Sequence, residues 1–134
     1  MKIVIIDGQG GRIGRMLVEG IIEKVDKNDL VVIGTNTLAT AAMIKAGATQ
    51  AATGENPIVF NSQDADLIVG PIGIVMANSM LGEVTEKMAS AVSSSRAKKI
   101  LIPISKCNHV VVGMNSQPLS FYIDEAIQEI FRSF

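Results

Sequence analysis

Residues 3–14 read Ile3-Val4-Ile5-Ile6-Asp7-Gly8-Gln9-Gly10-Gly11-Arg12-Ile13-Gly14, an apolar run followed by a glycine-rich turn. The run is β-branched and does not alternate with polar residues, which is typical of a strand covered on both faces. The turn leads into a helical pattern over 12–25, and a second apolar run follows at 30–33. This order predicts a strand–helix–strand unit with a right-handed crossover, and so a parallel sheet.

The rest of the chain alternates between helical and apolar patterns. Helices are expected at 37–46, 56–63, 74–81, 85–95 and 118–131. Strands are expected at 49–53, 67–69, 99–104 and 109–114, and the short link 105–108 predicts that the last one is antiparallel. We therefore predict a three-layer, Rossmann-like open α/β sheet, mostly parallel, with a C-terminal helix and a single domain over 1–134.

Composition excludes several classes of protein. With 134 residues the chain has the size of one ordinary domain. Its 12 Lys and Arg against 13 Asp and Glu give no basic excess for nucleic acid. One cysteine, Cys107, excludes an internal disulfide and a multi-cysteine zinc site, so no metal is predicted.

No segment is expected to enter a membrane. The longest uncharged stretch, 67–82, has 16 residues and contains glycine and proline, whereas a span needs about 20 apolar residues. The first apolar run stops at Asp7, too early for the core of an export signal. Together with the single cysteine, this predicts a cytoplasmic protein.

The glycine turn predicts a phosphate site. Glycines allow a backbone to approach a phosphate, and the free amides at a helix N-terminus hold the anion. The G-x-G-x-x-G pattern fails at Ile13, but a G-x-x-G-x-x-G pattern fits Gly8, Gly11 and Gly14. The candidate binding residues here are Gly8, Gln9, Gly10, Gly11, Arg12, Ile13 and Gly14.

The spacing of these glycines resembles the opening of dihydrodipicolinate reductases and related nicotinamide-dependent enzymes, over about the first 15 residues. The resemblance implies NAD or NADP as the cofactor, with another nucleotide as the alternative. A tight turn that binds nothing is the structural alternative.

Two positions near this turn bear on the ligand. The end of the second strand, where NAD-binding domains usually carry an acidic residue, holds Thr35 and Asn36. Asn36 can hydrogen-bond a ribose or an adenine edge, so both residues are candidates, but the choice between NAD and NADP stays open. Asp7 would repel a phosphate unless Arg12 or a metal ion neutralises it, or it accepts amides of the turn itself.

A second loop is expected to face the glycine turn. Gly70, Pro71, Ile72 and Gly73 follow the fourth predicted strand, and ligands of open α/β sheets bind beyond strand ends where the strand order reverses. We therefore include these four residues in the predicted site. The alternative is a loop that only prepares the following helix.

Other candidate features are weaker. Cys107 and His109 would point to one side of an extended segment and could form a reactive thiolate pair, although a structural role is favoured. No catalytic residue is assigned. Ile72, Met76 and Met80 recur every four residues and predict a helix face that packs in the core or contacts a second copy, so a homodimer is expected.

The landmarks taken together resemble a family of small bacterial proteins classed as a domain of unknown function with Rossmann-like character. They are Asp7-Gly8-Gln9-Gly10-Gly11, Gly34-Thr35-Asn36, Thr53-Gly54-Glu55-Asn56, Gly70-Pro71-Ile72-Gly73-Ile74, and Lys99-Ile100-Leu101-Ile102-Pro103-Ile104 with Cys107-Asn108. The likeness spans nearly the whole chain. It implies the fold and supplies no activity.

The leading functional hypothesis is a nucleotide- or dinucleotide-binding protein, a sensor or an accessory subunit, that holds a small phosphorylated ligand on Gly8 to Gly14. One alternative is a small NAD(P)-dependent oxidoreductase whose site is completed at a homo-oligomer interface. The other is a structural interaction module without a ligand. A chain of 134 residues leaves no room for a separate substrate domain, which favours binding over catalysis.

Overall fold

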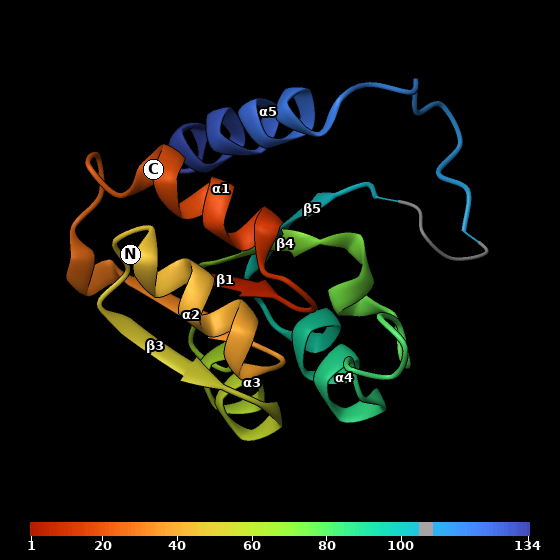
Figure 1. Ribbon diagram of the computed structural model, residues 1–134, viewed down its shortest axis with the longest axis horizontal. Coiled ribbons are helices and arrows are strands. Elements are labelled where there is room, and N and C mark those ends of the chain that lie inside the picture. The colour runs from red at the N-terminus through yellow and green to blue at the C-terminus, as the bar shows by residue number, and fades with distance from the viewer. Residues whose placement is uncertain (105–108) are drawn as a thin grey trace.

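A computed structural model of the protein describes residues 1–104 and 109–134 (Figure 1). Its one sheet has five strands: β1 (Ile3–Asp7), β2 (Leu30–Gly34), β3 (Gln50–Thr53), β4 (Leu67–Pro71) and β5 (Lys98–Ile102). The α-helices are α1 (Arg12–Ile21), α2 (Thr37–Lys45), α3 (Glu55–Ser62), α4 (Glu86–Ser94) and α5 (Leu119–Arg132). Two short 3-10 helices are η1 (Lys27–Asp29) and η2 (Ile72–Val75).

The strands lie in the order β3-β2-β1-β4-β5, and every pairing is parallel. Strand β1 is central and buried along its whole length, as its β-branched run predicts. The chain adds β2 and β3 on one side of β1 and then crosses to add β4 and β5 on the other. The strand order therefore reverses between β1 and β4, and that junction is where ligands of open α/β sheets bind.

Helices cover both faces of the sheet, which gives three layers. One core lies between the sheet and α1, α2 and α5, where Ile3 and Ile5 point. The other lies between the sheet and α3, η2 and α4, where Val4 and Ile6 point. Alternate residues of one strand thus serve two cores. Among the described residues no helix is both long enough and apolar enough to cross a membrane.

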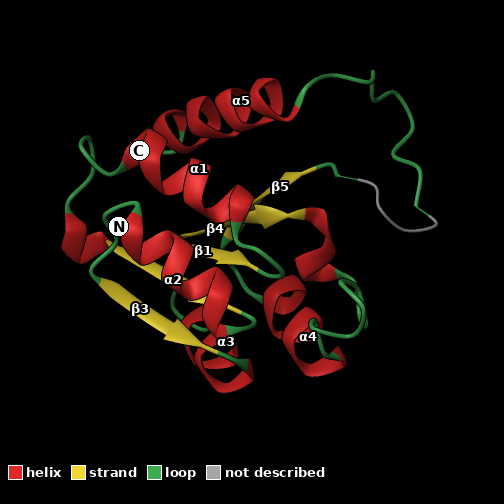
Figure 2. Ribbon diagram, in the orientation of Figure 1, coloured by secondary structure: helices red, strands yellow, loops and turns green. Residues whose placement is uncertain are grey.

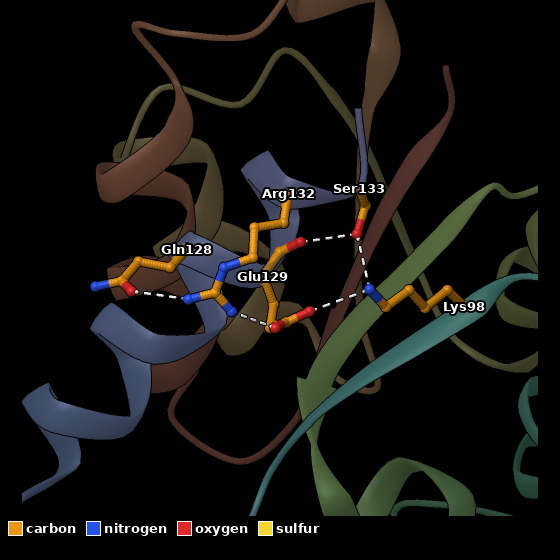
Figure 3. A network of polar contacts seen from close by, with 5 residues as sticks. All are labelled: Lys98, Gln128, Glu129, Arg132 and Ser133. Atoms are coloured by element: carbon orange, nitrogen blue, oxygen red, sulfur yellow. Dashed lines mark hydrogen bonds and ion pairs between the residues drawn. The ribbon is translucent and has the colours of Figure 1, made fainter.

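Helix α5 is attached to the sheet by apolar packing and by a polar network at its end (Figure 3). Lys98 of β5 donates to Glu129 at 3.0 Å and to Ser133 at 3.1 Å, and Arg132 also pairs with Glu129. The hydrogen bond from Lys98 is the main reason that the pKa of Glu129 lies below its ordinary value. These charges are exposed and add little stability, so the buried side chains of Ile123 and Ile130 carry the attachment.

The predicted antiparallel last strand is wrong. Residues 109–114 form no strand, and Figure 2 draws them as loop. Val110 and Val112 are 89% and 94% exposed, and Gly113 has a φ of +85°, which turns the chain. An apolar run forms a strand only where another strand pairs with its backbone, and none of the described strands lies beside this segment. The predicted link 105–108 lies outside the described residues.

The predicted helix at 74–81 is also wrong. The chain forms the short helix η2 and then a loop, 76–84, in which Asn78, Met80 and Leu81 have φ values of +66°, +56° and +57°. Such values are incompatible with a right-handed helix. The remaining predicted helices and strands are present with ends displaced by a few residues; α1, for example, ends at Ile21 rather than at residue 25.

The central strand supplies a test of this architecture. Ile5 is fully buried, whereas Leu38 on α2 is 67% exposed. Ile5→Ala should lower the free energy of unfolding by roughly 2–5 kcal/mol because it leaves a cavity between packed layers. Leu38→Ala should change it by less than about 0.5 kcal/mol. Urea denaturation measures both, and equal effects of the two changes would contradict the layer assignment.

Candidate functional site

The turn between β1 and α1 depends on a left-handed glycine. Gly11 has a φ of +74° and immediately precedes the first residue of α1. Its amide donates to the carbonyl of Gly8 at 2.9 Å, which closes the turn. A Cβ atom at this position would lie 2.7 Å from the Cα atom of Ala39 on α2. Both the backbone conformation and the close approach of α2 therefore require glycine.

The carboxylate of Asp7 fixes the glycine turn through hydrogen bonds to its backbone amides. The side chain of Asp7 is 3% exposed; Oδ1 accepts from the amide of Gly8 at 2.8 Å and Oδ2 from the amide of Gly14 at 2.7 Å. Burial raises the pKa of Asp7, the backbone hydrogen bonds oppose this, and the charge of Glu83 adds to the rise. Of the two roles left open for Asp7, the structure shows the acceptor of turn amides.

The carboxylate of Glu83 also contacts the glycine turn. Glu83 follows η2 in the chain, and its Oε1 atom accepts from the amide of Gln9 at 2.8 Å, from Thr35 Oγ1 at 2.7 Å and from Asn36 Nδ2 at 2.8 Å. Partial burial raises the pKa of Glu83, but the three hydrogen bonds together outweigh it and hold the pKa below its ordinary value. Three donors thus converge on one carboxylate oxygen.

Asn36 has a structural task besides its contact with Glu83. Its Oδ1 atom accepts from the amide of Ala39 at 2.9 Å and so caps the N-terminus of α2. Its amide group also donates to the carbonyl of Gln9 at 3.0 Å. Asn36 therefore ties the second helix to the glycine turn.

A cavity of about 530 Å³ opens beside the glycine turn, at the carboxyl ends of β1, β4 and β5. Residues 8–13 line one side and the exit of β4 lines another. Loop 76–84 and residues 103, 104, 109, 111 and 119 complete the wall. The lining outside residues 8–13 consists of Asp7, Pro71, Ile72, Gly73, Met76, Ser79, Met80, Leu81, Pro103, Ile104, His109, Val111 and Leu119.

The structure brings most of the predicted site residues to this cavity. Nine of the thirteen line it: Gly8, Gln9, Gly10, Gly11, Arg12, Ile13, Pro71, Ile72 and Gly73. Four do not. Gly14 donates its amide to Asp7, Thr35 and Asn36 face Glu83, and Gly70 is buried within β4 against the carbonyl of Ile6. The predicted juxtaposition of the glycine turn with the β4 exit is present.

Other predictions have mixed outcomes. Met76 and Met80 line the cavity rather than one face of a helix, since no helix forms there. His109 lines the cavity, whereas Cys107 lies outside the described residues, so the proposed pair is not placed. Over 1–104 and 109–134, no group of three His, Cys, Asp or Glu side chains could hold a metal ion. Glu83 was not among the predicted residues, because its partners are 47 to 74 positions away.

The turn geometry predicts that two neighbouring glycines respond differently to substitution. Gly11→Ala places a side chain on a left-handed residue and against the backbone of α2, which should cost roughly 1–3 kcal/mol. Gly10→Ala meets no atom within 4 Å of the new Cβ and should be tolerated. Thermal unfolding of the two variants measures the difference, and an equally stable Gly11→Ala protein would refute the geometry.

The contacts of Glu83 predict a pH-dependent contribution to stability. Since its folded pKa lies below the ordinary value of 4.5, its contribution is present above pH 4.5 and is lost as the pH falls through the folded pKa. At pH 7 the wild type should be more stable than Glu83→Gln by about 1 kcal/mol, and this difference should disappear in acid. Chemical denaturation at several pH values measures it. Glu23→Gln, on an exposed side chain, is the matched control; a difference for Glu83→Gln that does not vary with pH would contradict the assignment.

Comparison with known proteins identifies a family and no activity. A family model described as a domain of unknown function, DUF3842, matches residues 2–134. No curated protein and no solved structure matches the chain. The match confirms the resemblance to a family classed as a domain of unknown function. The chain belongs to the DUF3842 family.

Proposed function

We propose that the protein binds a small phosphorylated ligand, a nucleotide or dinucleotide, with a phosphate at the glycine turn. The observation that carries this proposal is the position of the cavity. It lies where the strand order reverses between β1 and β4, and residues 8–13 form one of its sides. Open α/β sheets bind their ligands at this position, and a glycine turn at the start of a helix is their usual phosphate site.

The turn retains donors for an anion. Asp7 takes the amides of Gly8 and Gly14, but those of Gly10 and Arg12 have no acceptor among the described residues. Arg12 lines the cavity, and its side chain forms no ion pair with the part of the chain that the structure describes. We call Gly10 and Arg12 the outer edge of the turn. A phosphate is favoured there by their two amides, by the positive end of α1 and by the guanidinium group of Arg12.

The rest of the cavity suits the organic part of such a ligand. Its walls are mostly apolar, with Ile72, Met76 and Leu119 among them, and a few polar groups, Ser79 and His109, interrupt them. Small-molecule sites have this mixture and volumes of about 300–1,000 Å³. The cavity volume of about 530 Å³ falls within that range.

The resemblance of the turn to that of dihydrodipicolinate reductases places NAD and NADP first among the candidate ligands. In our proposal the domain acts as a sensor or an accessory subunit in the cytoplasm. An oxidoreductase completed by a second copy and an interaction module without a ligand are the alternatives. A ligand panel separates them, since only the oxidoreductase would also turn over the cofactor.

The panel should contain NAD, NADP, their reduced forms, ATP, AMP, FAD and S-adenosylmethionine. A true ligand at 100 times its dissociation constant should stabilise the protein by about 2.7 kcal/mol, which a thermal shift detects. Arg12→Ala should then weaken binding roughly tenfold or more, because it removes a charge-assisted hydrogen bond. Calorimetric titration measures the affinities.

Matched variants distinguish ligand binding in the cavity from general effects of charge. Arg15 lies on the same helix, pairs with Glu19 at 3.0 Å and does not line the cavity, so Arg15→Ala should bind like the wild type. Gly10→Asp should abolish binding by repelling the phosphate, whereas Gly10→Asn, of the same size, should retain it. A folded protein that binds no member of the panel would overturn the proposal.

A further inference from the structure

The side chain of Glu83 lies on the glycine turn and at the end of β2. Loop 76–84 carries it across the glycine turn to the end of β2, where Gln9, Thr35 and Asn36 donate to its Oε1 atom. A Cβ atom at Gly8 would lie 2.5 Å from Met80 Sδ and 3.1 Å from Glu83 Oε1, so both side chains lie directly on the turn. The loop thus covers the part of the turn that faces β2.

The three donors around Glu83 are suited to an anionic oxygen. They come from the turn and from the end of β2, and they approach one oxygen atom within 2.7–2.8 Å. Domains that bind NAD usually present a carboxylate at the end of the second strand, which accepts from the ribose hydroxyls. Here the same place presents a hydroxyl and an amide group as donors. This reversal favours a phosphate or carboxylate group over a ribose diol.

We propose that Gln9 N, Thr35 Oγ1 and Asn36 Nδ2 form an anion subsite of the crevice, and that Glu83 is its internal occupant. A ligand phosphate binds there by displacing the carboxylate of Glu83. The inference rests on the proposed function, since it concerns the same glycine turn. It makes Glu83 a competitor that lowers the apparent affinity for any ligand that needs this subsite.

The loop does not need the carboxylate of Glu83 for its own shape. Asn78 donates its amide to the carbonyl of Val84 at 2.7 Å, and Val84 donates to Ser79 at 3.2 Å, which closes the loop at its base. Val84 is 1% exposed and anchors the loop in the core. Rotation of the Glu83 side chain is therefore sufficient to vacate the subsite, and the loop can keep its fold.

Electrostatics makes the exchange feasible. Glu83 is only partly buried, so its displaced carboxylate can be hydrated. An incoming phosphate takes over the same three donors. The competition is then between an internal and an external anion for one set of hydrogen bonds.

The test uses inorganic pyrophosphate as the probe, because it carries the anionic groups alone. Calorimetric titration of the full chain should show that Glu83→Gln, which lacks the competing charge, binds pyrophosphate roughly tenfold more tightly than the wild type. Glu83→Ala, which removes the acceptor altogether, should also bind pyrophosphate more tightly than the wild type. Glu86→Gln removes a nearby exposed charge and should bind like the wild type.

A spectroscopic readout distinguishes displacement from a merely structural role. In the proposal, saturating pyrophosphate returns the pKa of the Glu83 carboxyl, followed by carbon NMR, from its lowered value toward 4.5 or above. Equal or weaker binding by Glu83→Gln and Glu83→Ala would overturn the proposal, as would pyrophosphate binding that leaves the Glu83 titration unchanged. The nucleotide panel decides the proposed function separately: nucleotides that bind in an Arg12-dependent way while pyrophosphate binds no variant would sustain that function and reject this subsite.

Discussion

The carboxylate of Asp7 is buried at the end of the central strand and holds the amides of Gly8 and Gly14, 2.8 and 2.7 Å away. The bond from Gly14 satisfies a backbone donor in the first turn of α1 that no helical carbonyl can reach, and the bond from Gly8 holds the residue that follows β1. They fix the path of the turn, and with it the direction in which α1 leaves the sheet. Gly11 then allows α2 to approach, and Asn36 joins α2 to the glycine turn at the same place.

The hydrogen bonds of Asp7, together with those of Glu83, restrict where a ligand anion can bind. Asp7 and Glu83 place two carboxylates around one turn, and each accepts from backbone amides that a phosphate would otherwise contact. The amides of Gly10 and Arg12 remain without an acceptor in the described part of the chain. Arg12 is also among the residues that line the cavity. We therefore propose that a phosphate first binds at the amides of Gly10 and Arg12. It binds at the end of β2 only after it displaces the carboxylate of Glu83.

Local patterns were sufficient to predict most of the fold. The unbroken β-branched residues of β1 and β2 predicted a buried parallel sheet, and the glycines after β1 and β4 predicted two loops facing one crevice. The errors fell where local composition does not decide the structure. The apolar residues 74–81 are compatible with a helix by composition, but hydrogen bonds between Asn78, Ser79 and Val84 favour a closed loop. The valines at 110–112 have strand propensity and, in the described chain, no strand beside them.

Glu83 could not be recognised from the sequence for a related reason. Its role depends on three donors from two distant segments, and nothing near it in the chain marks it as part of a site. Thr35 and Asn36 were predicted from their place at the end of the second strand. In the structure both donate to Glu83 and neither lines the cavity.

The most direct test of the central claim, that a phosphorylated ligand binds at the glycine turn, is a map of backbone amide shifts. Proton–nitrogen NMR spectra recorded during titration with the ligand that emerges from the panel would report on each amide separately. The account predicts that the largest shifts occur at Gly10 and Arg12, with changes at Ile72 and Gly73 across the cavity. Shifts that concentrate on another surface, with the amides of residues 8–13 unchanged, would contradict it.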